Sequence, residues 1–145
     1  MPKARFTAHT SLSSSDVMTV LTDFGRDRAS WWPNVDEAYF RMHESGPDWA
    51  EVTEGNALAW ERERYSWDAM AGTVTIETLD SNLWAPGSGW RYQLTPADGG
   101  TDVDVSLTRV PKSVRGRLVG ALIAVAGARA LGRQFRSVLR KAETR

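Results

Sequence analysis

The order of the predicted elements restricts the fold of this chain more than any other feature of the sequence. Six segments show the two-residue alternation of half-buried strands, and turns rich in glycine and proline separate most of them. These segments are residues 37–45, 48–55, 57–67, 72–80, 89–96 and 101–110. A helical pattern then runs from Lys112 to the end of the chain. A sheet built from such hairpins has to bury one face, and the last helix is the only remaining element large enough to cover it.

The N-terminal part of the chain adds one strand and two short helices to this order. Residues 6–12 alternate as a strand does, and Ser13 is a candidate N-cap for a helix over 13–24. A second helical turn, RDRASWW, has to end before Pro33, because the residue before a proline avoids the α-helical region. We therefore predict an α+β fold in which a curved antiparallel sheet of about six or seven strands wraps around a long C-terminal helix.

The composition excludes several classes of functional site. The 145 residues include no cysteine, so disulfides, iron–sulfur clusters, thiolate zinc sites and a cysteine nucleophile are all ruled out. The chain has no HExxH, GxGxxG or Walker pattern and no Ser–His–acid spacing, so we expect no metal and no cofactor. A hydrophobic content of 41% with 25% charged residues is typical of one globular domain, which we place over residues 1–145.

The distribution of apolar residues gives an expectation about location. The first ten residues lack the apolar core of a signal peptide. The longest apolar stretch, residues 118–128, has 11 residues, whereas a helix that spans a bilayer needs about 20. We therefore expect a cytoplasmic protein without a transmembrane segment.

The predicted order of elements resembles the helix-grip fold of the START-like superfamily. That superfamily includes the birch-pollen-allergen-like proteins and the polyketide cyclase/dehydrase-like (SRPBCC) family. The resemblance covers about residues 5–142 and is carried by LTDFGRDRASWWP, WAEVTEG, WERERYSW and the closing helix. It implies a deep cavity between sheet and helix that holds an apolar or aromatic small molecule. Members include binders and carriers as well as cyclases, so the fold does not choose between these functions.

The segment WERERYSW decides which charges face such a cavity, because alternate residues of a strand share a face. Its two faces are Trp60, Arg62 and Arg64 on one side, and Glu61, Glu63, Tyr65 and Trp67 on the other. In the tight symmetric register with the next strand, Glu63 lies opposite Glu77, which places like charges together. A shift by one residue places Arg64 opposite Glu77, and we favour this register, although a bulge in the turn would restore the other.

The favoured register directs Glu61 and Glu63 inward and places Asp80 of the neighbouring strand near Glu61. An inward carboxylate is costly unless it is hydrogen-bonded, paired with a cation or solvated at the cavity mouth. One interpretation is an acid/base pair with a raised pKa that assists enolisation or dehydration. The other is structural: the strand curls at this end, and the carboxylates meet water, Arg91 or Arg109. Under the rejected register, Arg62 and Arg64 would face the cavity and could hold an anionic head group.

The remaining candidate lining residues are aromatic or apolar side chains on inward strand faces, in loops and on the closing helix. Trp90 and Tyr92 each carry a polar atom that needs a partner, which suits a cavity wall. Arg109 either snorkels at the end of its strand or anchors a ligand carboxylate. The predicted site for a small apolar or aromatic ligand is lined by Trp32, Phe40, Glu61, Glu63, Tyr65, Trp67, Ile76, Trp90, Tyr92, Val105, Leu107, Arg109, Leu118 and Leu122.

The closing helix is basic. Residues 112–145 carry nine basic side chains and one acidic, whereas residues 1–111 carry nine basic and seventeen acidic. Four arginines fall in one narrow sector of the helix: Arg129, Arg133, Arg136 and Arg140. They form either a solvated stripe or a contact for an anionic partner. No aromatic residues are interleaved with them, so we expect no nucleic acid. Apolar residues surround the axis over 114–125, which indicates room beneath the helix or an outer contact such as a homodimer.

Three functions are therefore compatible with the sequence. The first is binding or carriage of a small hydrophobic molecule. The second is a polyketide cyclase/dehydratase-like enzyme, in which Glu61 or Glu63 carries the proton and Arg109 anchors a carbonyl or carboxylate. The third is a module for a membrane surface or a nucleic acid, built on the arginine stripe.

Overall fold

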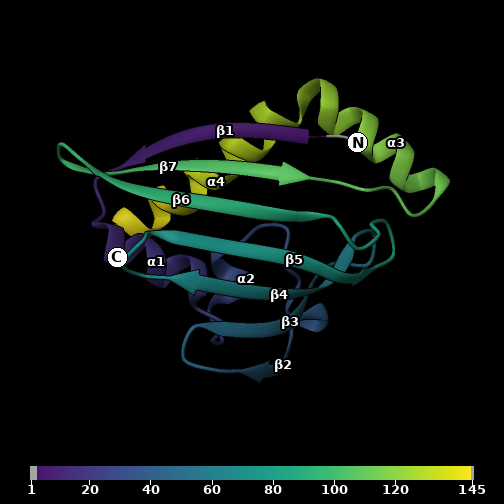
Figure 1. The fold of residues 1–145 in the computed structure, drawn as a ribbon, viewed down its shortest axis with the longest axis horizontal. Helices are drawn as coiled ribbons and strands as arrows, with labels where there is room; N and C mark the ends of the chain where they lie inside the picture. The colour runs from purple at the N-terminus through teal and green to yellow at the C-terminus, as the bar shows by residue number, and fades with distance from the viewer. Residues whose placement is uncertain (1–2, 145) are drawn as a thin grey trace.

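The structure, a computed structural model, describes residues 3–144 and contains one antiparallel sheet of seven strands (Figure 1). The strands lie in the order β1-β7-β6-β5-β4-β3-β2, so that the first strand of the chain pairs with the last. Their bounds are β1 Lys3–Thr10, β2 Arg41–Ser45, β3 Trp49–Gly55, β4 Trp60–Asp68, β5 Thr73–Ser81, β6 Gly89–Ala97 and β7 Gly100–Thr108.

Two short helices follow β1, and a long helix closes the chain. The short helices are α1 (Ser14–Thr22) and α2 (Arg28–Trp31). The closing helix consists of α3 (Val114–Leu122), one π-helical segment η2 (Ile123–Gly127) and α4 (Ala128–Glu143). The predicted α+β architecture is therefore confirmed. No helix within the described residues is long and apolar enough to cross a bilayer.

One predicted strand begins later than expected. The alternation of residues 37–45 predicted a strand throughout, but a turn of 3₁₀-helix, η1 (Glu37–Tyr39), occupies its first part. The side chain of Asp36 accepts a hydrogen bond from the backbone N–H of Ala38 at 3.0 Å, which stabilises this turn. Strand β2 therefore starts only at Arg41.

Helix α4 covers the inner face of the sheet. Figure 1 shows α4 crossing behind β1, β7 and β6. Its side chains Phe135 and Leu139 belong to the same buried cluster as Phe6 of β1, Tyr92 of β6 and Val105 of β7. The inward residues of β7 alternate strictly with exposed ones, as the period of two requires. Residues of α1 and of the strands β3, β4 and β5 belong to the same cluster, so the core lies between the helices α4 and α1 and the inner face of the sheet.

The register between β4 and β5 is the one that the sequence favoured. Arg64 lies opposite Glu77 and Tyr65 lies opposite Ile76. A β-bulge interrupts this register, since Glu63 pairs with Thr78 but the preceding residue of β4, Arg62, pairs with Asp80. This extra residue in β5 exchanges the faces of the strand, so that Asp80, which we expected beside Glu61, points outward and is exposed.

The two arginines of β4 lie on the outer face of the sheet. Arg62 and Arg64 form ion pairs with Glu51 of β3, at 3.5 and 3.1 Å. These pairs are partly exposed, and such pairs contribute at most about 1 kcal/mol each. The interpretation in which Arg62 and Arg64 face the cavity is therefore wrong.

Helix α3 exposes most of its apolar side chains. Figure 1 shows α3 extending beyond the ends of β1 and β7. Four large apolar residues of α3 and the π-helical segment are 66–88% exposed: Val114, Leu118, Leu122 and Val125. Gly116 lies against the 82–88 loop, where an added Cβ would come within 2.4 Å of the carbonyl oxygen of Leu83. The small residue therefore permits a close approach of α3 to this loop.

Candidate ligand cavity

A cavity of about 230 Å³ lies between the inner face of the sheet and the closing helix. The strands β3 to β6 and the ends of their loops supply most of its walls. The closing helix contributes Val119, Ile123, Leu131 and Gln134. The other lining residues are Leu21, Arg28, Trp32, Asn34, Val35, Glu54, Gly55, Asn56, Ala59, Glu61, Glu63, Tyr65, Ile76, Leu83, Trp84, Trp90, Tyr92, Leu107 and Arg109.

Nine of the residues that the sequence singled out as ligand contacts line this cavity. They are Trp32, Glu61, Glu63, Tyr65, Ile76, Trp90, Tyr92, Leu107 and Arg109. They come from four strands, from the loop after α2 and from the residue after β7. The strand alternation and the β4–β5 register therefore place these strand residues on the cavity side of the sheet, and their contact with a ligand stays a prediction.

Five further residues that we expected in the site lie elsewhere. Leu118 and Leu122 are largely exposed, because Val119 and Ile123 form the side of the closing helix that faces the cavity. Val105 is fully buried in the core beneath the cavity. Trp67 packs beside Phe24, with ring centroids 6.2 Å apart, and Phe40 packs against the margin of the same core.

The first polar cluster of the cavity is a buried ion pair. Arg28 Nε donates to Glu54 Oε1 at 2.8 Å, and Arg28 Nη2 donates to Glu54 Oε2 at 3.2 Å. The hydroxyl of Tyr65 accepts from Arg28 Nη2 at 2.7 Å and donates to Glu54. Only 3% and 8% of the Arg28 and Glu54 side chains are exposed. Arginine suits this position because its fork of donors satisfies both carboxylate oxygens.

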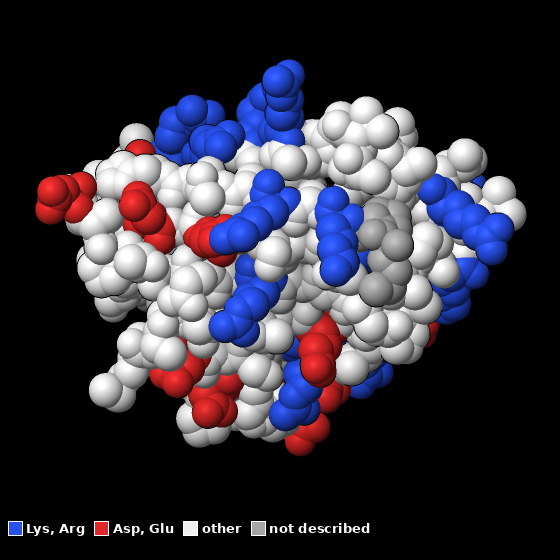
Figure 2. All heavy atoms as spheres, turned by 45° about the horizontal axis from the view of Figure 1, so that its top comes forward, with Lys and Arg blue, Asp and Glu red and all other residues white. Residues whose placement is uncertain are grey.

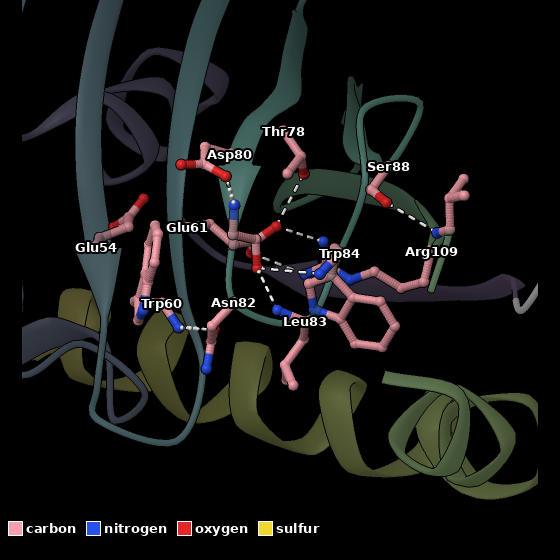
Figure 3. A network of polar contacts seen from close by, with 12 residues as sticks. Glu54, Trp60, Glu61, Thr78, Asp80, Asn82, Leu83, Trp84, Ser88 and Arg109 are labelled. Carbon is pink, nitrogen blue, oxygen red and sulfur yellow. Dashed lines mark hydrogen bonds and ion pairs between the residues drawn. The ribbon is translucent and has the colours of Figure 1, made fainter. Parts of the chain in front are cut away.

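The second polar cluster joins Arg109 to Glu61 (Figure 3). Arg109 Nη1 donates to Glu61 Oε1 at 2.6 Å, and Nη2 donates to Oε2 at 3.0 Å. Thr78 Oγ1 also donates to Glu61 Oε1, at 2.8 Å. The guanidinium of Arg109 lies over the rings of Trp84 and Trp90, 5.0 and 5.6 Å from their centroids. Glu61 therefore has the arginine partner that the structural interpretation of the sequence required.

Glu63 is the third carboxyl group of the cavity and lies on the same face of β4 as Glu61. Burial, and then the negative charges of Glu61 and Glu54, raise the pKa of Glu63 well above the ordinary value of a glutamate. Burial also acts to raise the pKa of Glu54, but the charge of Arg28 and the hydrogen bonds from Arg28 and Tyr65 outweigh it and lower that pKa. Of these two carboxyl groups, Glu63 is therefore the one whose neutral form is favoured.

Two members of this network had no clear signal in the sequence. Glu54 shares the inward face of β3 with Ala50 and Val52. The only indication in the sequence was therefore that an acidic residue continues an apolar series. Arg28 lies in a helix of only four residues, which is too short to show a helical period.

In the described part of the chain, no group of three histidine, aspartate or glutamate side chains is placed to hold a metal ion.

Comparison with known proteins supports the architecture. No protein-family model and no curated protein sequence matches this chain. The solved structure of the Zhui aromatase/cyclase from Streptomyces sp. R1128 matches it with a TM-score of 0.75 at 14% identity, over 97% of this chain and 93% of that one. A START superfamily protein from Mycobacterium smegmatis matches with a TM-score of 0.78 at 12% identity, over 99% of both chains. The chain has a START-like fold.

The match extends to a third structure, Ara h 8.0201, with a TM-score of 0.65 at 11% identity, over 99% of this chain and 98% of that one. The resemblance predicted from the sequence is thus confirmed at the level of the START-like fold. Because the identities are this low, the likeness shows the fold alone, and a fold of this kind supports more than one function.

Proposed function

We propose that this START-like protein binds and carries a small apolar or aromatic molecule in the cavity between its sheet and its closing helix. The observation that carries this proposal is a cavity of about 230 Å³ that combines aromatic walls with a hydrogen-bonded polar floor. Ligand sites are typically concave and mostly apolar, with a few convergent polar groups. The structures of similar fold are compatible with this proposal.

The volume of the cavity limits the size of the ligand. An engineered apolar cavity of about 150 Å³ holds benzene. A cavity of about 230 Å³ therefore suits a molecule of one or two rings. A larger polycyclic molecule would require the closing helix or the loops around Asn34 and Asn56 to move outward.

Native mass spectrometry of the protein as purified, with denaturing release of any bound compound, is the first experiment. It would be followed by calorimetric titration with tetralin and 1-tetralone, two bicyclic probes of suitable size. Leu131→Trp should fill the cavity from α4 and lower the affinity for both probes at least tenfold. Leu58→Trp is the matched control, because Leu58 is 74% exposed and lies outside the cavity. The absence of a bound compound together with no binding of either probe would overturn the proposal.

Glu63 supports a second candidate function, a cyclase or dehydratase. A carboxyl group that keeps its proton inside an aromatic cavity can act as a general acid. In a dehydration, Glu63 would donate its proton to the hydroxyl oxygen that leaves as water, while a base removes the proton from the carbon next to a carbonyl. One of the structures of similar fold is named as an aromatase/cyclase.

The two candidate functions differ in the effect of removing the carboxyl proton donor. A suitable probe is 4-hydroxy-4-phenylbutan-2-one, whose dehydration yields an enone with strong ultraviolet absorbance. An enzyme should form the enone, and Glu63→Gln and Glu61→Gln should abolish turnover. A carrier should bind the probe without converting it, and Glu63→Gln should leave the affinity within about threefold.

A further inference from the structure

The charges at the floor of the cavity are already matched. Arg28 and Glu54 form one pair with two hydrogen bonds, and Arg109 and Glu61 form the other. Between 3% and 14% of these four side chains is exposed. Each arginine therefore has a carboxylate partner within the protein, and neither is a free cation that waits for an anionic ligand.

Glu63 adds a third carboxyl group to the floor, and neither Arg28 nor Arg109 is left to pair with it. It is buried, with 4% of its surface exposed, and the charges of both Glu54 and Glu61 act on it. A ligand carboxylate at this floor would bring another negative charge close to these groups with no unpaired arginine to neutralise it. A buried charge without a partner is strongly disfavoured. A ligand ammonium would first require the ionisation of Glu63 in this buried setting.

Two buried N–H groups of the cavity lack a partner among the described residues. They are Arg109 Nε, which is not used in the ion pair with Glu61, and Trp32 Nε1. Both side chains line the cavity. Both N–H groups are buried, so an acceptor oxygen on a ligand would reach either of them only after a small movement of the side chains around it. An unsatisfied buried donor costs about 1–3 kcal/mol, and this contact would remove that cost.

From these observations we infer that the cavity selects an uncharged ligand with a carbonyl-type acceptor oxygen over charged ligands of the same size. This inference rests on the proposed function, because it specifies the chemistry of the molecule that the cavity binds. The expectation that Arg109 anchors a ligand carboxylate is thereby replaced, since Glu61 takes that role within the protein.

A series of four bicyclic compounds tests the inference, because its members differ only in the group on one carbon. The compounds are 1-tetralone, tetralin, 1-aminotetralin and tetralin-1-carboxylate. Calorimetric titration at neutral pH should give the highest affinity for the ketone. We expect tetralin to bind several-fold more weakly, and the ammonium and carboxylate compounds at least tenfold more weakly than the ketone.

A substitution that removes one of the negative charges at the floor of the cavity provides a second, independent test. Glu61→Gln leaves Arg109 without its carboxylate partner, so the affinity for tetralin-1-carboxylate relative to 1-tetralone should rise at least tenfold. Glu51→Gln is the matched control, because Glu51 pairs with Arg62 and Arg64 on the outer face of the sheet. This control should keep the selectivity of the wild-type protein.

The outcomes separate the inference from the proposed function. Equal or tighter binding of the carboxylate or ammonium compound by the wild-type protein would overturn the inference, while the proposed function would stand. Equal binding of tetralin and 1-tetralone would overturn the requirement for an acceptor oxygen. If none of the four compounds binds, both the inference and the proposed function fail. The wild-type series decides these points even if Glu61→Gln does not fold.

Discussion

The protonation state of Glu63 depends on the side chains around it more than on its own chemistry. Arg28, Glu54, Glu61 and Arg109 contribute charges that act on it, and burial favours its neutral form. Its folded-state pKa is raised, so the folded protein keeps a proton that the unfolded chain releases. Folding stability should therefore fall as the pH rises from the ordinary glutamate pKa of about 4.3 toward the raised folded value.

Glu63→Gln tests this linkage, because glutamine mimics the neutral acid. We expect the variant to match the wild-type protein in acid. Its advantage in the free energy of unfolding should then grow by about 1.4 kcal/mol per pH unit within that window. Urea denaturation across a series of pH values measures it, with Glu51→Gln as the control on the outer face. A difference between Glu63→Gln and wild type that does not change with pH would show that folding does not raise the pKa of Glu63.

The pair Arg28–Glu54 leads to a second prediction at this scale. Arg28→Met leaves Glu54 buried without its cation, which should cost about 3–5 kcal/mol of stability. The double variant Arg28→Met/Glu54→Met should lose less than the sum of the two single changes, since it removes the uncompensated charge. Arg64→Met, in a partly exposed pair, should cost about 1 kcal/mol or less. Strictly additive effects at Arg28 and Glu54 would contradict the buried pair.

At the scale of elements, local patterns predicted most of the fold and part of the cavity. Alternation along β4 and charge pairing with Glu77 were enough to fix which face of β4 turns inward. Alternation cannot reveal a bulge, so the reversed faces at Asp80 were missed. A helix that is apolar on all sides does not show which side meets the sheet, and Leu118 and Leu122 were therefore placed on the wrong side of α3. That choice depends on where the helix axis runs, which is a property of the tertiary structure.

The contact at Gly116 yields a prediction about α3. A Cβ at this position would approach the carbonyl oxygen of Leu83 to 2.4 Å, so Gly116→Ala should displace α3 from the 82–88 loop. Hydrogen exchange of the amides in α3 should become at least tenfold faster, while exchange in α4 stays unchanged. Arg115→Ala, an exposed neighbour in the same helix, is the control. Unchanged exchange in Gly116→Ala would mean that α3 does not depend on this contact.

At the scale of the whole molecule, the closing helix carries both a high density of basic side chains and a row of exposed apolar ones. Figure 2 shows lysine and arginine side chains along the upper edge of one face and at its right end, where α3 lies in Figure 1. An apolar ridge on α3 and η2 consists of Val114, Leu118, Leu122 and Val125, which are all largely exposed. Exposed apolar side chains in such a row are typical of an interaction surface. The homodimer through residues 114–125 stays a prediction, and this ridge is its physical basis.

Sedimentation velocity measures the oligomeric state and tests that prediction directly. We expect the wild-type protein to sediment as a dimer at micromolar concentrations, and Leu118→Glu/Leu122→Glu to sediment as a monomer with an unchanged circular dichroism spectrum. Leu58→Glu, which changes another exposed leucine, should leave the dimer intact. A wild-type protein that remains monomeric over the whole concentration range would rule out self-association through this ridge.

The pairing of β1 with β7 has a consequence for the biosynthesis of the protein. Lys3 lies opposite Thr108, so β1 is translated long before β7, the strand with which it pairs. Contacts so distant in sequence form slowly, because a long loop has to close first. The helical side of the cavity, from Val119 to Gln134, is translated later still. A nascent chain shorter than this therefore has no enclosed site, and ligand capture is an event that follows translation of the closing helix.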